Sequence, residues 1–224
     1  FVPRNLQRSE PATFGQQLSV LAQPRLLLVY AITALGYGGT FLSFTYLASI
    51  LQDVTGFSAN AVSGVLLVYG VSVAIGNLWG GRLADRRGPI PALKLIFALL
   101  AAVLFVLTFT AYNTWLVLLT VLALGAVAFG NVPGLQVYVV KQAQRFAPQA
   151  ADVASGLNIA AFNVGIALGA SLGGLVVDHF GLMHTPWLGA LVVMGAFGLT
   201  ALSGRLDRRD GVADRAEGIA VSAH

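Results

Sequence analysis

The chain has 224 residues, of which 57% are hydrophobic and only 10% are charged, against about 25% charged residues in an average soluble domain. Its mean hydropathy is +0.79, and it contains 26 glycines and no cysteine. These values exclude a soluble enzyme, a nucleic-acid-binding domain, a disordered segment and any cysteine-based disulfide or metal site. They predict a polytopic helical membrane protein.

Long stretches of the chain lack Asp, Glu, Lys, Arg and His. There are five such stretches, over residues 26–52, 54–81, 95–140, 153–177 and 185–204. A helix needs about 20 apolar residues to cross the hydrocarbon core, so four of these stretches hold one span each. The longest, 95–140, holds two spans joined at Tyr112-Asn113-Thr114. The sequence therefore predicts an all-α membrane fold with six transmembrane helices, over residues 26–51, 60–81, 91–111, 115–140, 153–177 and 186–203.

The two ends of the chain lie outside the predicted spans. Residues 1–25 are polar and are predicted to form a cytoplasmic linker segment. Residues 204–224 mix Arg and Asp without apolar periodicity, which predicts a solvated, poorly ordered cytoplasmic tail. The chain begins at Phe1 and not at Met, which leaves open whether it is a fragment or a complete six-span protein.

The basic residues predict the orientation of the chain. All 13 Lys and Arg residues lie on one predicted side of the membrane, in the segments 1–25, 82–94, 141–152 and 204–224. The loops on the other side hold none. By the positive-inside rule both termini are cytoplasmic, and the protein is expected to be a multi-pass protein of the cell (inner or plasma) membrane.

Two segments share the spacing G-x-x-x-G-G-x-x-x-D-x-x-G, one from Gly76 to Gly88 and one from Gly169 to Gly181. The first closes the second span and the second closes the fifth, so they end on opposite faces of the membrane. A three-helix unit repeated with inverted topology is typical of secondary transporters. The sequence therefore predicts a 3+3 inverted repeat.

The repeated turn allows two interpretations. Its Asp is expected just past the helix end, where backbone N–H groups can bind it, and its last Gly permits positive φ. One interpretation is a structural hairpin with basic residues that retain it in the cytoplasm. The other is a gating latch that docks in only one conformational state, made by Gly81, Asp85, Arg86 and Gly88.

The segment Gly81-Arg-Leu-Ala-Asp85-Arg86-Arg87-Gly88 resembles the loop signature of the major facilitator superfamily, although it departs at Pro89 and Ile90, where the family usually has basic residues. Further segments, around Phe44, 54–58, 73–81 and 157–169, are similar to the second half of the drug:proton antiporter branch, and within it to sugar-efflux (arabinose-type) permeases. The resemblance covers about residues 20–205.

The resemblance implies a twelve-span fold of two six-span halves, with this chain as spans 7–12 and a missing N-terminal half as its partner. It also implies alternating access around a midplane cavity, driven by the proton gradient. The predicted spans contain no Asp or Glu, so a titrating carboxylate in the membrane must come from the missing half.

Aromatic, hydroxyl and amide side chains are predicted to line the cavity. Tyr37, Thr40, Phe41 and Phe44 follow the spacing i, i+3, i+4, i+7 and share one helix face. They can also pack against lipid or other helices, and the asparagines of the fifth span can hold helices together instead. The candidates are Tyr37, Thr40, Phe41, Phe44, Asn131, Asn158, Phe162 and Asn163.

Glycine and proline mark two further features. Gly165, Gly169 and Gly173 form a double G-x-x-x-G, which predicts a helix-packing seam. Asn131 precedes Pro133-Gly134, where proline removes a backbone donor and glycine loosens the helix, so a kink is expected there.

The sequence thus predicts a small-molecule transporter that works by alternating access, with proton-coupled efflux of a drug, a sugar or a similar amphipathic solute. Its expected partners are that solute, protons and the lipid bilayer, with no cofactor, metal or nucleic acid. A complete six-span protein that acts as a dimer, or a non-transporting scaffold, is the alternative. No enzyme activity is expected, since Ser63 and Ser155 lack the glycine two residues earlier that an intramembrane serine protease needs.

Overall fold

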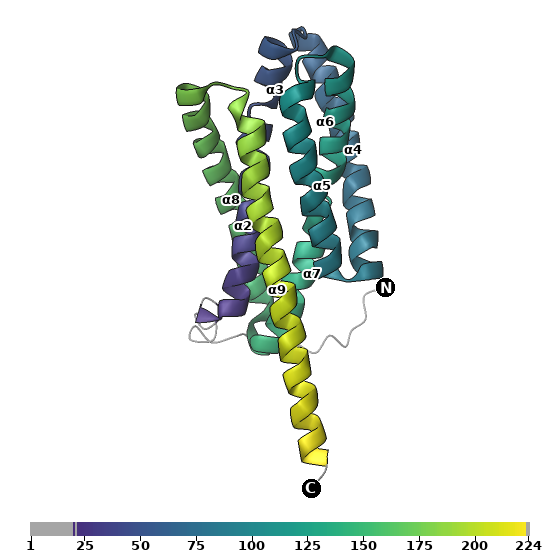
Figure 1. The fold of residues 1–224 in the computed structure, drawn as a ribbon, viewed down its shortest axis with the longest axis vertical. Coiled ribbons are helices and arrows are strands. Elements are labelled where there is room, and N and C mark those ends of the chain that lie inside the picture. The colour runs from purple at the N-terminus through teal and green to yellow at the C-terminus, as the bar shows by residue number, and fades with distance from the viewer. Residues whose placement is uncertain (1–19, 21, 223–224) are drawn as a thin grey trace, which may run out of the picture.

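The computed structural model describes residue 20 and residues 22–222, with side chains described as far as residue 210. Residues 1–19 and 21 of the predicted linker and residues 223–224 of the predicted tail lie outside the described residues. Within the described part every regular element is helical (Figure 1). The elements are α2 (Pro24–Phe44), α3 (Leu47–Ser49), the π-helical turn η1 (Ile50–Val54), α4 (Ala59–Arg87), α5 (Pro89–Thr110), α6 (Thr114–Ala128), α7 (Asn131–Phe146), the 3-10 turn η2 (Pro148–Ala150), α8 (Ala151–Phe180) and α9 (His184–Ser222).

Six helical stretches of the described chain are long and apolar enough to cross a membrane, which confirms the predicted all-α fold of six spans. Several reach beyond the charge-free stretches. The long side chains of Arg87 and Arg145 lie near span ends, where they can reach the interface, and the last stretch ends at Asp210. The stretches are Pro24–Val54, Ala59–Arg87, Pro89–Thr110, Thr114–Phe146, Pro148–Phe180 and His184–Asp210.

The prediction of a poorly ordered tail is wrong for residues 204–222, which continue α9. The cause is visible in the first turns after the span. Ser203 and Asp207 contact polar groups of α7, and Asp210 pairs with Arg25 at the start of α2. These partners are distant in the sequence, so the composition of the tail alone does not reveal them.

The helices pack in a pattern that repeats between the two halves of the chain. Helix α2 packs on α8 and α9, α6 and α7 pack on α4 and α5, and α5 packs on α9. Exchanging α2 with α6–α7, α4 with α8, and α5 with α9 maps this pattern onto itself. Such an exchange is what a 3+3 inverted repeat requires.

Glycines allow the closest helix contacts in both halves. A Cβ atom at Gly165 or Gly169 of α8 would overlap the backbone of α2 at Ala34 or Gly38. Gly173 continues this contact, so the three glycines predicted as a packing seam lie along α2. The close approach maximises van der Waals contact where no hydrophobic effect drives association.

Helix α4 has the equivalent seam in the other half of the repeat. A Cβ atom at Gly76 would overlap the backbone of Ala126 in α6, and one at Gly80 would overlap that of Gly130. The second helix of each half therefore uses glycines to approach the first helix of the other half.

The first helix of each half is interrupted. The predicted kink lies at Phe129–Gly130, between α6 and α7, where Pro133 cannot donate to the Phe129 carbonyl and the Val132 N–H does so at 3.2 Å. The interruption after Phe44, between α2 and α3, was not predicted. There the Thr45 hydroxyl bonds back to the Phe41 carbonyl at 2.7 Å, a contact that often bends helices.

The two repeated turns close α4 and α8 in the same way. Gly88 has φ +82° and Gly181 has φ +96°, a region that favours glycine. One expectation needs correction, because Asp85 lies inside the last turn of α4 and Asp178 inside that of α8, and not past the helix ends. Each helix continues beyond its charge-free stretch, which shifts the carboxylate into the helix.

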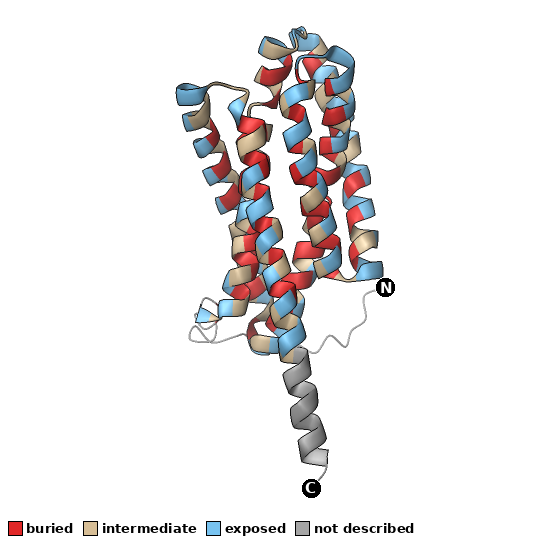
Figure 2. Cartoon of the chain, in the orientation of Figure 1, coloured by how far each residue is buried: buried red, intermediate tan, exposed pale blue. Residues whose placement is uncertain are grey.

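Burial is uneven among the six spans (Figure 2). Within the most apolar window, 61% of the Pro24–Val54 span is buried, against 17% of the α4 span and 28% of the Pro148–Phe180 span that contains α8. Helices α4 and α8, at the two edges of the bundle in Figure 1, expose leucines such as Leu67 and Leu168. Their outer faces are apolar and lie outside the core of this bundle.

Candidate functional site

Six aromatic side chains from α2, α4, α8 and the α6–α7 break form one group, called here the aromatic cluster. Tyr37 lies edge-on to Phe162 with ring centroids 4.5 Å apart, and Phe44 stacks on Tyr69 at 5.1 Å. Such offset and edge-on pairs are the favoured arrangements of aromatic rings. The members are Tyr37, Phe41, Phe44, Tyr69, Phe129 and Phe162.

Some rings of the aromatic cluster are buried and others are partly accessible. Tyr37 and Phe162 are 5% and 9% exposed. Phe41, Phe44 and Phe129 are half-buried. The half-buried rings form an apolar surface, a type of lining that suits apolar and amphipathic ligands.

The hydroxyl groups near this cluster differ from the expectation. Thr40 is only 2% exposed and donates to the Gly36 carbonyl at 2.7 Å, so its hydroxyl bonds within α2. The hydroxyls of Ser43 and Tyr69 are buried and have no hydrogen-bond partner among the described residues. A buried hydroxyl without a partner is costly, which makes Tyr69 the stronger candidate for a polar contact.

Sequence reasoning missed Tyr69 and Phe129. Tyr69 lies in an apolar helix, and only its stacking on Phe44 shows its place. Phe129 immediately precedes the predicted kink, so the kink was an available signal for it.

Asn158 connects three helices. It is fully buried, its Oδ1 accepts from the Thr33 hydroxyl at 2.7 Å, and its Nδ2 donates to Gln136 Oε1 at 3.2 Å. These bonds join α8 to α2 and α7. An amide in hydrocarbon needs such partners, and here they come from the protein.

The other two asparagines have different surroundings. Asn163 is exposed, and its Nδ2 bonds to the Ile159 carbonyl within α8 at 3.2 Å. Asn131 is fully buried at the start of α7, where Nδ2 donates to the Ala128 carbonyl at 3.3 Å. Its Oδ1 has no partner among the described residues.

Replacing Asn158 by Ala is expected to destabilise the fold by about 1–2 kcal/mol, because Thr33 and Gln136 lose their shared partner in a buried place. Thermal unfolding in detergent measures this change. Asn163→Ala on the same helix is the control and should change stability by less than about 0.5 kcal/mol. Equal effects of the two variants would show that the Asn158 bonds contribute nothing.

The loop motif lies at the end of α4. Asp85 and Arg86 are exposed, Gly88 makes the turn, and Gly81 faces Pro133, which a Cβ atom would approach at 3.7 Å. Among the described residues Asp85 has no hydrogen bond or ion pair. A carboxylate in the last turn of a helix opposes the helix dipole by about 0.3–1 kcal/mol, so the position of Asp85 in α4 disfavours its charge, and no direct bond in the described chain offsets this.

A polar network that the sequence did not predict joins α2, α7 and α9 near one end of their membrane-spanning stretches. The two Asp207 carboxylate oxygens accept from the Tyr138 hydroxyl at 2.9 Å and from Gln142 Nε2 at 2.8 Å. Tyr138 also bonds to Ser203 at 2.5 Å. Arg25 completes the network, since its guanidinium lies 4.0 Å from Asp207 and pairs with Asp210. The network fixes residues 203–210 of α9 to the bundle.

No three His, Asp or Glu side chains of the described residues come together in a metal-binding arrangement.

Comparison with known proteins shows a family relationship. A sequence model of the Major Facilitator Superfamily matches residues 2–151. The chain is 54% identical over 209 residues to "Uncharacterized MFS-type transporter YtbD" of Bacillus subtilis, which covers 93% of this chain and 52% of the relative. It is 36% identical over 191 residues to "Inner membrane transport protein YdhP" of Escherichia coli K12, which covers 85% of this chain and 48% of the relative.

A more distant relative carries a more specific name. The chain is 31% identical over 181 residues to "Probable sugar efflux transporter" of Pasteurella multocida, with 81% of this chain and 43% of the relative covered. The chain thus spans about half the length of the curated relatives it matches.

Proposed function

The chain belongs to the Major Facilitator Superfamily, and we propose that it forms one six-span half of a transporter that exports small molecules by alternating access. The aromatic cluster is the observation that carries this proposal. It joins residues of four helices and leaves three rings half-buried. It also adjoins both helix interruptions, after Phe44 and at Phe129–Gly130. Discontinuous helices at corresponding positions of two repeat units commonly mark transporter binding sites.

The partner in the proposed transporter is a second six-span half. The relatives are about twice as long as the matched segment. The apolar outer faces of α4 and α8 also suit contact with other transmembrane helices. In this arrangement the aromatic cluster lines the space between the halves, and both termini are cytoplasmic, as the distribution of Lys and Arg favours.

The proposed substrate is a sugar, a drug or a similar amphipathic solute. The name of the Pasteurella relative refers to sugar efflux, and the half-buried rings suit the apolar face of such a solute. Efflux is proposed to be coupled to protons. The central parts of the six spans carry no Asp or Glu, so the proton carrier belongs to the partner half.

A transport assay of the intact protein tests the function. Cells or proteoliposomes are loaded with a panel of sugars and amphipathic compounds, and efflux is compared with and without a proton gradient. Gradient-dependent efflux of at least one compound is expected. Absence of transport for every compound would contradict the transporter proposal, and efflux that is independent of the gradient would contradict proton coupling alone.

Replacing Phe41 by Ala is expected to raise the KM for the exported compound roughly three- to tenfold. The ring contacts Tyr37, Phe44 and Phe129 and is half-buried, and an aromatic contact contributes about 0.5–1.5 kcal/mol. Concentration-dependent efflux measures this effect. Phe105→Ala, in an exposed aromatic pair on α5, is the matched control and should leave KM unchanged. If Phe41→Ala also leaves it unchanged, the cluster does not bind the substrate.

A further inference from the structure

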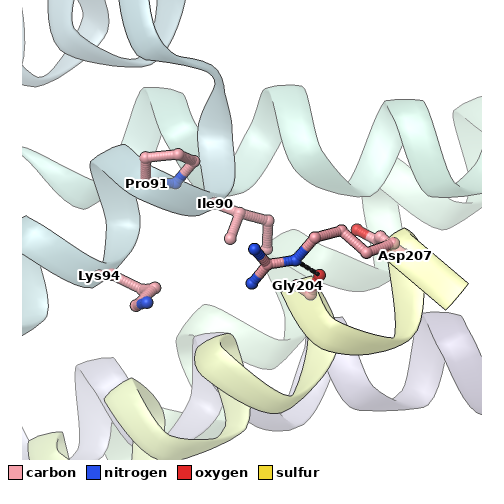
Figure 3. Close-up of a pocket in the computed structure, with 6 residues that line it drawn as sticks. Ile90, Pro91, Lys94, Gly204 and Asp207 are labelled. Carbon is pink, nitrogen blue, oxygen red and sulfur yellow. Dashed lines mark hydrogen bonds between the residues drawn. The ribbon is translucent and has the colours of Figure 1, made fainter.

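A cavity of about 520 Å³ lies between the start of α5 and the end of the α9 span (Figure 3). Helix α5 lines it with Ile90, Pro91 and Lys94, and α9 with Gly204, Asp207 and Arg208. A second cavity of about 290 Å³ shares three of these residues. Neither cavity includes a residue of the aromatic cluster or of the loop motif.

Cations dominate these two cavities, called here the α5–α9 site. Lys94 and Arg208 line the larger cavity, and Lys141 and Arg145 line the smaller one. Among the residues whose side chains are described, Asp207 is the only carboxylate that lines either cavity. Its oxygens already accept two hydrogen bonds from α7, and Arg25 lies 4.0 Å away. Because the carboxylate already has partners, a ligand in these cavities would meet a mainly positive charge.

The side chains are arranged around an apolar surface. Figure 3 shows Lys94 on α5 at one side of the larger cavity and Asp207 on α9 at the other, with Ile90 between them and Pro91 on the same side as Lys94. Arg208 donates from Nε to the Gly204 carbonyl at 3.3 Å. This bond fixes the guanidinium and leaves its terminal nitrogens to bind an anion.

The α5–α9 site lies near one end of two membrane-spanning stretches, Pro89–Thr110 and His184–Asp210, where lipid headgroups are expected. Lys94 is in the second turn of α5, about 7.5 Å along the helix from Pro89. Farther into the same spans, Leu95, Leu99 and Leu202 are 36%, 38% and 44% exposed. A molecule whose anionic group occupies the cavity and whose chains lie on these leucines would match both surfaces.

We propose that the α5–α9 site binds the phosphate headgroup of an anionic phospholipid, with Lys94 and Arg208 as its principal ligands. Basic pockets between transmembrane helices at the membrane interface bind such headgroups. A soluble anion would use the cations but not the exposed leucines beside them. The proposal needs only insertion of the six spans, so it stands or fails independently of the transported substrate.

Lipid binding to the intact protein in mild detergent tests this proposal by native mass spectrometry. The protein is offered equal amounts of cardiolipin, phosphatidylglycerol and phosphatidylcholine. We expect the two anionic lipids to remain bound in preference to phosphatidylcholine. The double variant Lys94→Gln with Arg208→Gln should bind cardiolipin about 30-fold more weakly, which corresponds to about 2 kcal/mol.

A second double variant controls for overall charge. Arg205 and Arg209 are exposed on α9 and do not line either cavity, so Arg205→Gln with Arg209→Gln removes the same charge near the same membrane surface. It should keep the preference for anionic lipid. An equal loss in both double variants would overturn the proposal, because binding would then follow net charge and not the site.

Two further outcomes also decide the matter. Displacement of cardiolipin by millimolar inorganic phosphate would indicate a site for soluble anions and overturn the proposal. If the variant Lys94→Gln with Arg208→Gln cannot be recovered folded, the wild-type protein still provides a test. Equal retention of cardiolipin and phosphatidylcholine by the wild type would contradict the proposal. Lys94→Arg with Arg208→Lys keeps both charges and should retain the lipid preference.

Discussion

Replacing Asp85 by Asn is expected to lower efflux by roughly tenfold or more while the amount of protein in the membrane stays the same. Asp85 is exposed in the last turn of α4, where the helix dipole disfavours it, and it has no partner among the described residues. A role in transport therefore requires a partner outside the described chain, and we propose that the second half supplies it in one conformational state.

The size of the effect follows from the energy of such a contact. A hydrogen bond to a charged group contributes about 1.5–3 kcal/mol, and each 1.4 kcal/mol changes an equilibrium constant about tenfold. Loss of a contact made in only one state would shift the two-state equilibrium of the transporter by that factor. The initial rate of efflux from loaded cells, divided by the amount of protein in the membrane, measures the loss.

Asp178→Asn is the matched control, since Asp178 occupies the same position in the second copy of the turn. The residues around it are Leu175, His179 and Phe180, without the arginines of the first copy, and we expect this variant to keep most of the efflux. If Asp85→Asn transports normally, the latch interpretation fails and the structural-hairpin interpretation of the turn is retained.

Replacing Gly76 by Ala is expected to destabilise the fold by about 3 kcal/mol, at the upper end of the cost of overpacking. The added methyl group would overlap the backbone of Ala126 in α6. Backbone atoms cannot move aside as a flexible side chain can, so α4 and α6 must separate. Thermal unfolding in detergent should show a clearly lower transition temperature than that of the wild type.

Gly70→Ala is a control on the same helix with the opposite expected sign. A Cβ atom at Gly70 meets nothing within 4 Å, and alanine in place of a mid-helix glycine gains about 0.5–1 kcal/mol. The same substitution six residues earlier should therefore raise the transition temperature. A similar response of both variants would contradict the close approach of α4 and α6.

The six spans were predictable because each lies in or overlaps a charge-free stretch of the chain, and the lipid environment excludes charge from the middle of a helix. The kink at Phe129–Gly130 was predictable for a similar local reason, since Pro133 cannot donate a backbone hydrogen bond. Features of this kind depend on residues close together in the chain.

The aromatic cluster and the polar network were predictable only in part, because their contacts join distant segments. Phe41 and Phe44 follow from helical spacing, but the stacking of Tyr69 on Phe44 depends on how α4 packs. Asp207 was predicted to lie in a poorly ordered tail, since its partners, Tyr138 and Gln142, lie on another helix and the composition of the tail does not reveal them. Helical periodicity predicts on which face of its helix a residue lies, but not which residue of another helix it contacts.

The contacts of α2 also bear on the order in which the protein is made. Helix α2 packs on α8 and α9, which are synthesised after it, and the bond from Arg25 to Asp210 spans 185 residues. At about 5–20 residues per second, the ribosome needs roughly 10–40 s to reach that partner. During this interval the surface of α2 that faces the glycines of α8 stays uncovered in the bilayer, so the contacts of α2 are complete only after α9 has entered the membrane.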